Sequence, residues 1–256
     1  MSLKKTTGIV LSSSIIGEAD VKANFLCRDE GKKSFIFKGL KKSSRRPQNA
    51  AEPGTVIGII YNEHSGKEIV TARDFSVIKY FAGIRADFQK IICSSFLLEL
   101  VERTTGFGST ENSVFNFLAN ALSSIEKTDR PLDLAVFFVI RLMKIHGIFA
   151  PAKRCKICGS ENFDEFVFDT LDMGLICRKC SPANPNLLGR EALDFVSESL
   201  TVKFTELRSY TPYSRHGLLL QFSLFLEQYF NIKIHSRKLL LDITHAQQSA
   251  IDIEKL

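Results

Sequence analysis

The sequence predicts an α+β protein, with a small five-stranded β-barrel at the amino terminus and a helical domain after it that carries a four-cysteine zinc-finger insert. Three observations predict this fold class. Short β-type runs fill the first 80 residues, the hydrophobic period then becomes helical, and four cysteines with metal-ligand spacing interrupt the helical part. The predicted domains are residues 1–80 and 81–256, with the zinc-finger segment at about 151–182.

The predicted barrel is built from β-type runs at 8–11, 21–26, 34–37, 55–61 and 68–78. Turn residues such as Gly17, Gly54 and the pair Ser65-Gly66 separate these runs. Apolar residues alternate at Val21, Ala23 and Phe25, as on a strand with one buried face. Five short strands in so few residues favour a closed barrel, which leaves no unpaired edge.

The net positive charge of the chain lies entirely in this first part. Residues 1–80 contain 14 basic and 8 acidic side chains, whereas residues 81–256 contain 20 of each. Eight of the basic residues fall between Arg28 and Arg46, where Asp29 and Glu30 are the only acids. A basic strand and loop on a small barrel favour contact with a phosphate backbone, although such a cluster is also compatible with a solvated loop or, more weakly, a nuclear localisation signal. We expect Phe35 and Phe37, inside this stretch, to be core residues.

The most specific short motif is C-x2-C-x18-C-x2-C, formed by Cys155, Cys158, Cys177 and Cys180. Two such pairs at this separation supply a closed tetrahedral shell of four thiolates, which is typical of a structural zinc site without an open catalytic position. Two disulfides or a redox-active pair are the alternatives. The zinc interpretation predicts tight turns at Gly159 and Gly174 and a short hairpin within 163–175.

Two further cysteines, Cys27 and Cys93, stand apart from this motif, and we expect them to be small core residues.

The part after residue 80 has helical periodicity. Helices are expected at 84–101, 112–125, 131–146, 191–200 and 213–230, with a turn-rich segment at 181–186. Gly147 is expected to end the third helix. One face of the first helix is predicted to be buried, with these members: Phe88, Ile91, Ile92, Phe96, Leu97 and Leu100.

No membrane segment or signal peptide is expected. The longest apolar run, Leu134 to Ile140, has seven residues against the about 20 that a bilayer requires, and serines at 12–14 interrupt the apolar stretch 8–16. We therefore expect a cytoplasmic protein. The sequence also contains no phosphate-binding loop, no paired histidines with ligand spacing and no clustered carboxylates, so no catalytic residues are predicted.

The order of these parts, together with several short motifs, resembles the bacterial recombination mediator family RecO. The segments that carry the resemblance are 8–11 (GIVL), 17–20 (GEAD), 38–43 (KGLKKS), 97–100 (LLEL), 138–159 (FVIRLMKIHGIFAPAKRCKICG), 174–180 (GLICRKC) and 236–239 (SRKL).

The resemblance implies that the barrel is an OB-fold and that the protein is a non-enzymatic mediator of recombinational DNA repair. It would bind single- and double-stranded DNA, anneal complementary strands, and engage RecR and the single-stranded DNA-binding protein. It would thereby help RecA load on strands coated by the single-stranded DNA-binding protein. The resemblance also implies a bacterial, cytoplasmic protein that is associated with the nucleoid. One structural zinc ion would be its cofactor. The implied DNA-contact residues are Arg28, Lys32, Lys38, Lys41, Lys42, Arg45 and Arg46, with Lys33 in reserve because neighbouring strand residues face opposite sides.

One segment departs from the family pattern. Val136 and Phe137 are apolar where relatives often carry polar residues just ahead of Phe138. This affects where the acidic tail of the single-stranded DNA-binding protein would dock, for which Arg141 and Lys144 are the nearest candidates. Two other classes of function stay open at this point: a zinc-stabilised nuclease or RNA-processing enzyme on the same scaffold, and an adaptor whose basic face meets an acidic protein.

Overall fold

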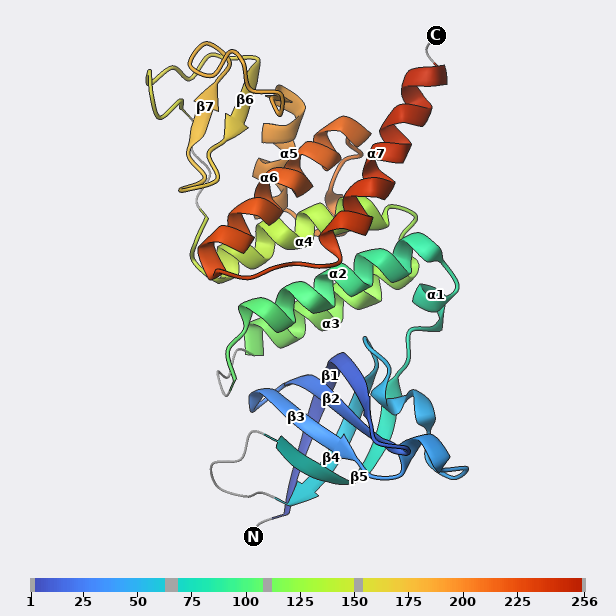
Figure 1. Cartoon of the computed structure of the whole chain (residues 1–256). Helices are drawn as coiled ribbons and strands as arrows, with labels where there is room; N and C mark the ends of the chain where they lie inside the picture. Colours follow the sequence, from blue (N-terminus) through green and yellow to red (C-terminus); the bar gives the residue numbers. More distant parts are fainter. Residues whose placement is uncertain (1–2, 63–68, 108–111, 150–153, 255–256) are drawn as a thin grey trace. The chain divides into compact units, whose positions relative to one another are not determined.

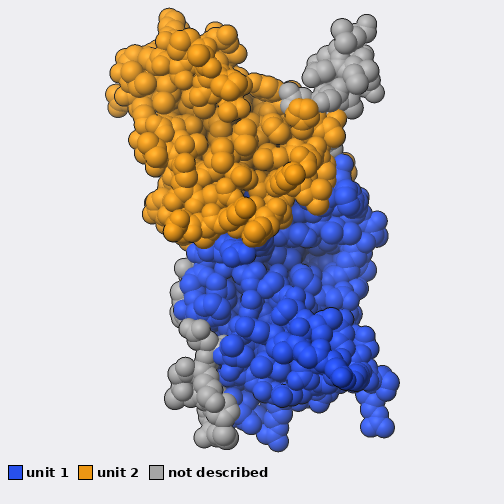
Figure 2. Space-filling view, viewed as in Figure 1, with its two compact units in different colours: residues 1–128 blue, residues 129–256 orange. Residues whose placement is uncertain are grey.

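The computed structural model describes residues 3–62, 69–107, 112–149 and 154–254. The chain forms two compact units, residues 1–128 and residues 129–256, which Figure 2 shows in separate colours. Each unit has its own core and is described by itself. The expected turn at Ser65-Gly66, the first residue of the run 68–78, and residues 151–153 of the expected zinc-finger segment lie outside the described residues.

The first unit begins with a closed barrel in the strand order β1-β2-β3-β5-β4 (Figure 1). The strands are β1 (Leu3–Ile16), β2 (Asp20–Cys27), β3 (Gly31–Phe37), β4 (Val56–Asn62) and β5 (Ile69–Lys79). Strands β3 and β5 pair in parallel, and the other pairs are antiparallel. This confirms the predicted OB-type barrel, although each strand is longer than, or shifted from, the run that predicts it.

Aromatic side chains fill the barrel. Phe25, Phe35, Phe37 and Tyr61 are fully buried, as expected for the phenylalanines. Their rings meet edge to face, with centroids 5.4 Å apart for Phe25 and Phe35 and 5.2 Å apart for Phe35 and Tyr61. Edge-to-face pairs of this kind stabilise a core beyond the area that they bury. Phe35 and Phe37 are therefore unable to stack on bases.

Two 3-10 segments, η1 (Leu40–Lys42) and η2 (Gln48–Ala51), cover one end of the barrel between β3 and β4. Leu40, Ala50 and Ala51 join the core of the barrel, so the loop is anchored by apolar side chains. Gly39 precedes η1 with a φ of 66°, a left-handed conformation that costs glycine little. The lysines and arginines of this segment are thus displayed on a fixed backbone.

Three helices complete the first unit: α1 (Ala82–Arg85), α2 (Phe88–Thr104) and α3 (Asn112–Lys127). The sequence predicts one helix over 84–101, but a break occurs at Asp87, whose carboxylate accepts a hydrogen bond from the Lys90 amide at 3.0 Å and caps α2. The predicted buried face is wrong for Phe88 and Ile91, which are 66% and 40% exposed. Both lie in the first turn of α2, away from the part of the helix that supplies its buried residues.

The second unit contains α4 (Pro131–Ile145), α5 (Arg190–Thr201), η3 (Phe204–Glu206), α6 (Pro212–Phe230) and α7 (Arg237–Glu254). Gly147 follows α4 with a φ of 69°, as predicted for its end. A small sheet in the order β7-β6-β8 is formed by β6 (Glu165–Phe168), β7 (Leu175–Cys177) and β8 (Leu188–Gly189). Antiparallel pairing of β6 with β7 confirms the expected hairpin. The sequence did not indicate α7 or β8.

Candidate metal centre and nucleic-acid interface

The four cysteines of the C-x2-C pairs meet at one point in the second unit. The Sγ atoms of Cys155, Cys158, Cys177 and Cys180 all lie within 4.8 Å of one another. Cys155 and Cys177 are buried, Cys180 is half-buried and Cys158 is exposed. The structure thus brings together all four residues that the motif nominates.

The spacing of the sulfur atoms fits a metal rather than a disulfide. The Sγ atoms of Cys158 and Cys177 are 3.7 Å apart. A tetrahedral zinc with Zn–S bonds of about 2.3 Å places its sulfur ligands about 3.8 Å apart, whereas a disulfide joins them at about 2.05 Å. The four thiols and their spacing therefore fit one tetrahedrally bound zinc ion.

Two tight turns aim the thiols at this point. In the first, the Gly159 amide donates to the Cys155 carbonyl at 2.9 Å, and in the second the Cys180 amide donates to the Cys177 carbonyl at 3.0 Å. Gly159 has a φ of 73°, as its place in the turn predicts. Gly174 does not have a positive φ; its neighbour Met173 does, at 55°. A Cβ at Gly174 would meet the Lys156 side chain at 2.6 Å, so close packing accounts for this glycine.

Main-chain donors surround the Cys155 sulfur. Burial alone raises the pKa of its thiol, but hydrogen bonds from the amides of Cys177, Cys158 and Ile157, with a smaller contribution from the Cys158 thiol, lower the pKa to about 6. The Cys177 amide lies 3.4 Å from this sulfur. Such donors favour the thiolate form, which is the form that binds metal.

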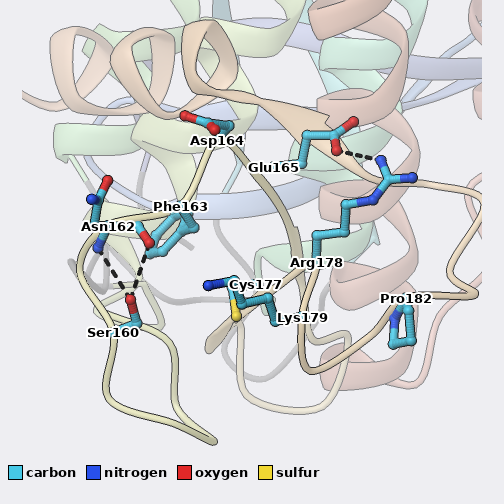
Figure 3. A pocket seen from close by; sticks show the side chains of 9 residues that line it. All are labelled: Ser160, Asn162, Phe163, Asp164, Glu165, Cys177, Arg178, Lys179 and Pro182. Carbon is cyan, nitrogen blue, oxygen red and sulfur yellow. Dashed lines mark hydrogen bonds and ion pairs between the residues drawn. The ribbon is translucent and has the colours of Figure 1, made fainter.

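Charges around the metal centre are balanced. Beside it lies a pocket of about 490 Å³ that is lined by residues including Asp164, Glu165, Arg178 and Lys179. Figure 3 shows Arg178 paired with Glu165 at the edge of this pocket. Lys156, in the first cysteine turn, bridges the carboxylates of Asp169 and Asp172 in the same hairpin. The described residues of this surface therefore carry no excess of positive charge for a polyanion.

The basic candidates on the barrel fall into two groups at opposite ends of β3. Lys32 lies near its start and Lys38 follows its end, and six residues of strand span about 20 Å. The first group is Arg28 and Lys32. The second group, which we call the basic loop, is Lys38, Lys41, Lys42, Arg45 and Arg46.

All five side chains of the basic loop belong to exposed residues. Lys38 and Lys42 pair with Asp20 at 3.6 Å and Glu18 at 2.7 Å, yet these lysine side chains remain 68% and 64% exposed. Arg46 donates to the Lys38 carbonyl at 3.2 Å, and its guanidinium lies over the Phe75 ring. Among the described residues, Lys41 and Arg45 have no ion-pair partner. Exposed pairs of this kind are weak, so a phosphate can replace the acids.

The candidates at the other end of β3 are already engaged within the first unit. Lys32 donates to the Glu102 carbonyl at 2.7 Å and lies over the Phe107 ring, and burial lowers its pKa. The Arg28 guanidinium lies 5.1 Å from the centre of the Phe115 ring. Lys33, the reserve candidate, pairs with Glu30 and donates to the Tyr61 hydroxyl at 3.0 Å.

A polar ladder crosses the outer face of β1, β2 and β3 and receives a carboxylate from α2. Ser12 faces Asn24 in the strand register, and Asn24 faces Ser34. Glu102 Oε1 accepts from the Ser12 hydroxyl at 2.6 Å and from the Asn24 amide at 2.8 Å. The Ser34 hydroxyl completes the ladder at 2.5 Å from Asn24 Oδ1. Sequence reasoning missed this ladder because its members are up to 90 positions apart.

The two cations near Phe138 have a structural use in the second unit. Arg141 donates to the Val202 carbonyl at 2.6 Å, and Lys144 donates to the Leu200 carbonyl at 3.1 Å. Both acceptors lie at the carboxyl end of α5, where cations stabilise the unpaired carbonyl groups. Within the described part of the chain, no helix has the length and hydropathy needed to cross a membrane.

An OB-type barrel with an exposed basic loop, joined to helices that carry a four-cysteine cluster, is an architecture of DNA-binding repair proteins. Comparison with known families agrees at both ends of the chain. Residues 1–81 match the family described as recombination protein O N terminal, and residues 85–238 match recombination protein O C terminal. The chain therefore belongs to the RecO family of DNA repair proteins.

Three relatives illustrate the range of similarity, and each is named DNA repair protein RecO. The protein of Acetivibrio thermocellus is 31% identical over 184 residues, which cover 70% of this chain and 71% of the relative. That of Syntrophus aciditrophicus is 30% identical over 189 residues, covering 72% and 73%. That of Desulfosudis oleivorans is 23% identical over 251 residues, covering 93% and 96%.

Proposed function

We propose that this RecO-family protein is a non-enzymatic recombination mediator, which binds DNA through its barrel, anneals complementary strands and helps RecA load on strands coated by the single-stranded DNA-binding protein. The observation that carries the DNA-binding part is the basic loop: five exposed cations on a backbone fixed by Leu40 and Ala50. RecR and the single-stranded DNA-binding protein are the proposed protein partners, by family membership.

Phosphate contacts can supply annealing without any catalytic group. Two complementary strands repel each other through their phosphates, and cations that neutralise these charges lower the repulsion and release bound counterions. Contacts to phosphates carry no sequence information, so such a surface accepts any pair of complementary strands. The exposed lysines and arginines of the basic loop suit this role.

The four cysteines would hold one structural zinc ion. A metal bound by four thiolates has no open position for a substrate, and its binding energy contributes to folding. Zinc would therefore fix the hairpin of β6 and β7 in the second unit, leaving the DNA contacts to the first unit.

Charge reversal in the basic loop tests the DNA-binding surface. We expect the fourfold variant Lys41→Glu, Lys42→Glu, Arg45→Glu and Arg46→Glu to bind DNA at least tenfold more weakly. The plot of log affinity against log salt concentration should also become flatter, by about 0.7 for each lost phosphate contact on a single strand. Fluorescence anisotropy with a labelled strand, over a series of salt concentrations, measures both effects.

A control variant should carry the same change in net charge at exposed cations elsewhere. The exposed residues Arg73, Lys127, Lys203 and Lys233 serve this purpose. Equal losses of affinity in the two variants would mean that overall charge, and not the basic loop, governs binding.

Annealing on coated strands tests the mediator function itself. The full-length protein should accelerate annealing of complementary strands that are covered with single-stranded DNA-binding protein, and the fourfold variant should be slower. Strand cleavage that follows the protein through purification would instead indicate a nuclease.

A further inference from the structure

The usual oligonucleotide face of the barrel is partly closed in this chain. In OB-folds, a bound strand crosses the face of strands 2 and 3 and the loops beside it. Here Glu102 of α2 occupies the middle of that face, bonded to Ser12 and Asn24, and Lys32 is bound to the same turn of α2. A carboxylate at this position also repels a phosphate. The bases of a strand held by the basic loop must therefore lie beside this face and not on its middle.

A cleft lies directly beside the basic loop. It has a volume of about 310 Å³ and separates the end of the β1–β2 hairpin from the two 3-10 segments. We call it the cap cleft, and its lining residues are Ser13, Ser14, Ile15, Val21, Lys41, Gln48, Ala51 and Glu52. Ends of β-barrels are common sites for small ligands, and a volume near the lower limit of about 300 Å³ suits a group of the size of one nucleotide.

We propose that the cap cleft holds one unpaired nucleobase of a single strand whose phosphates lie on the basic loop. This inference rests on the proposed DNA-binding function and adds the mode of binding. Lys41 belongs both to the basic loop and to the cleft wall, so a nucleotide with its phosphate on Lys41 has its base next to the cleft.

The lining of the cap cleft matches the chemistry of a base. Ile15, which is 62% exposed, offers apolar surface to a ring face, and the core residues Val21 and Ala51 form the apolar floor of the cleft. Gln48 donates through its amide nitrogen to the carbonyls of Lys41 and Ser43, each at 3.3 Å, which fixes the side chain and leaves its amide oxygen as an acceptor. The hydroxyl of Ser13, which lies on the same side of β1 as Ile15, supplies a donor or an acceptor. These groups suit the edge of any base, so the site is tolerant of sequence.

The one acidic residue of the lining is neutralised. The Glu52 carboxylate accepts from the Tyr80 hydroxyl at 2.8 Å and from Arg85 Nε at 3.2 Å. Arg85 therefore balances its charge, and Lys41 is the one cation of the lining.

The test compares three DNA probes of equal length with the full-length protein: a poly-thymidylate strand, a strand in which abasic sites replace alternate thymidines, and a duplex. Phosphate charge is the same in the two single strands, so any difference between them reports on base contacts. We expect the protein to bind the thymidylate strand about fivefold more tightly than the abasic strand, which corresponds to about 1 kcal/mol.

Filling the cleft should remove this preference. Ser13→Phe places an aromatic ring in the cleft on an exposed strand position and leaves the net charge unchanged, and we expect the two single strands to bind it equally. The matched control is Thr71→Phe, at an exposed position of β5 outside the cleft, which should keep the fivefold preference. If thermal unfolding shows that Ser13→Phe is not folded, Gln48→Ala replaces it, with a preference reduced to below about twofold.

The possible outcomes separate the two proposals. Equal binding of both single strands by the wild-type protein, or a preference that survives in Ser13→Phe, overturns the cap cleft as a base site while the basic loop stands. Absence of binding to all three probes overturns the proposed DNA-binding function itself.

Discussion

The six cysteines have two different environments, which can be told apart residue by residue. Cys27 and Cys93 are buried in the first unit. Burial raises the pKa of the Cys27 thiol to about 12 and raises that of Cys93 still further above its ordinary value. Cys158, in contrast, is exposed in the metal centre. The first two thiols are inert core groups, whereas the other four lie where they could bind a metal, and such binding would control their reactivity.

Thiol labelling should reveal this difference. In the native protein with zinc bound, we expect a maleimide reagent to modify at most the exposed Cys158, and only slowly, because zinc-bound thiolates are poor nucleophiles. After chelation, Cys155, Cys158, Cys177 and Cys180 should all react, while Cys27 and Cys93 stay unmodified until the chain unfolds. Mass spectrometry counts the adducts. Labelling of the four cysteines at one rate with and without chelator would argue against a bound metal.

His216 should make the second unit less stable in mild acid. Burial, with a smaller effect from His245, lowers the pKa of His216, and its Nδ1 lies 2.8 Å from the Thr244 hydroxyl on α7. The folded state therefore binds a proton less readily than the unfolded chain. The stabilising effect is present above the ordinary pKa of about 6.5 and is lost as the pH falls through the lower folded value.

We expect the Tm of the wild-type protein to fall between pH 7.5 and pH 5.5 by more than that of His216→Gln, which cannot titrate. Differential scanning calorimetry at matched ionic strength measures the difference. Parallel Tm curves for the two proteins would exclude His216 as the source of any acid sensitivity.

Single residues also show which features of the candidate sites could be predicted from the sequence and which could not. The four zinc-type cysteines could be found because their spacing is local. The roles of the cations could not: Arg28 and Lys32 belong to the same basic stretch as Lys41 and Arg45, yet their side chains contact α2, α3 and the segment that follows α2. Phe107 and Phe115, which lie under these cations, are about 75 or more positions further along the chain. A sequence shows which residues are charged, but it does not show which residues they contact in the fold.

Among the elements, α2 is joined to the barrel by the carboxylate of Glu102 as well as by its apolar face. Replacing Glu102 by alanine leaves the Asn24 amide and the Ser12 hydroxyl without this acceptor beneath the helix. Partly buried donors that lose an acceptor cost about 1–3 kcal/mol. We expect Glu102→Ala to lower the free energy of unfolding by this amount and Glu102→Gln by less, because glutamine keeps an acceptor oxygen.

Urea denaturation of the full chain measures these changes, with Ser95→Ala as the matched control. Ser95 is an exposed polar residue of the same helix, two turns before Glu102. A loss of stability in the control as large as that in Glu102→Ala would mean that the ladder contributes nothing specific.

Elements with a regular hydrophobic period were predictable, and those held by distant contacts were not. Alternation located the strands of the barrel, and 3.6-residue spacing located α3, α4, α5 and α6. The 3-10 segments η1 and η2 are too short to have a period, and only Leu40, Ala50 and Ala51 anchor them. For α7, the apolar run at 239–241 is consecutive rather than spaced, so the pattern gave no helix.

On the scale of the whole molecule, the chain has two cores. Barrel and helices α1 to α3 form one unit, and the four-cysteine cluster belongs to the other. The basic loop lies in the first unit, which carries a net charge of +5 from 18 basic and 13 acidic residues, whereas the second unit carries +1 from 16 and 15. The proposed DNA contact and the proposed metal site therefore lie in different units.

Expression of the two units as separate chains should separate these properties. We expect residues 1–128 to fold and to keep most of the affinity for single-stranded DNA, with the same salt dependence as the full chain. Residues 129–256 should bind zinc and show little DNA binding. Circular dichroism, elemental analysis and anisotropy measure these outcomes. Strong DNA binding by residues 129–256 alone would mean that the basic loop is not the main DNA contact.

The polar ladder, with Glu102 as its acceptor, also limits where the chain can be cut and joined to that of a relative in evolution. Exchanging the barrel between relatives by a cut after β5 would remove α2 from the sheet and leave Ser12 and Asn24 without the carboxylate that accepts their hydrogen bonds. The unit that keeps these hydrogen bonds runs to Thr128 and includes the three helices α1, α2 and α3. Barrel and helices should therefore be inherited together, with Glu102 and Asn24 changing as a pair.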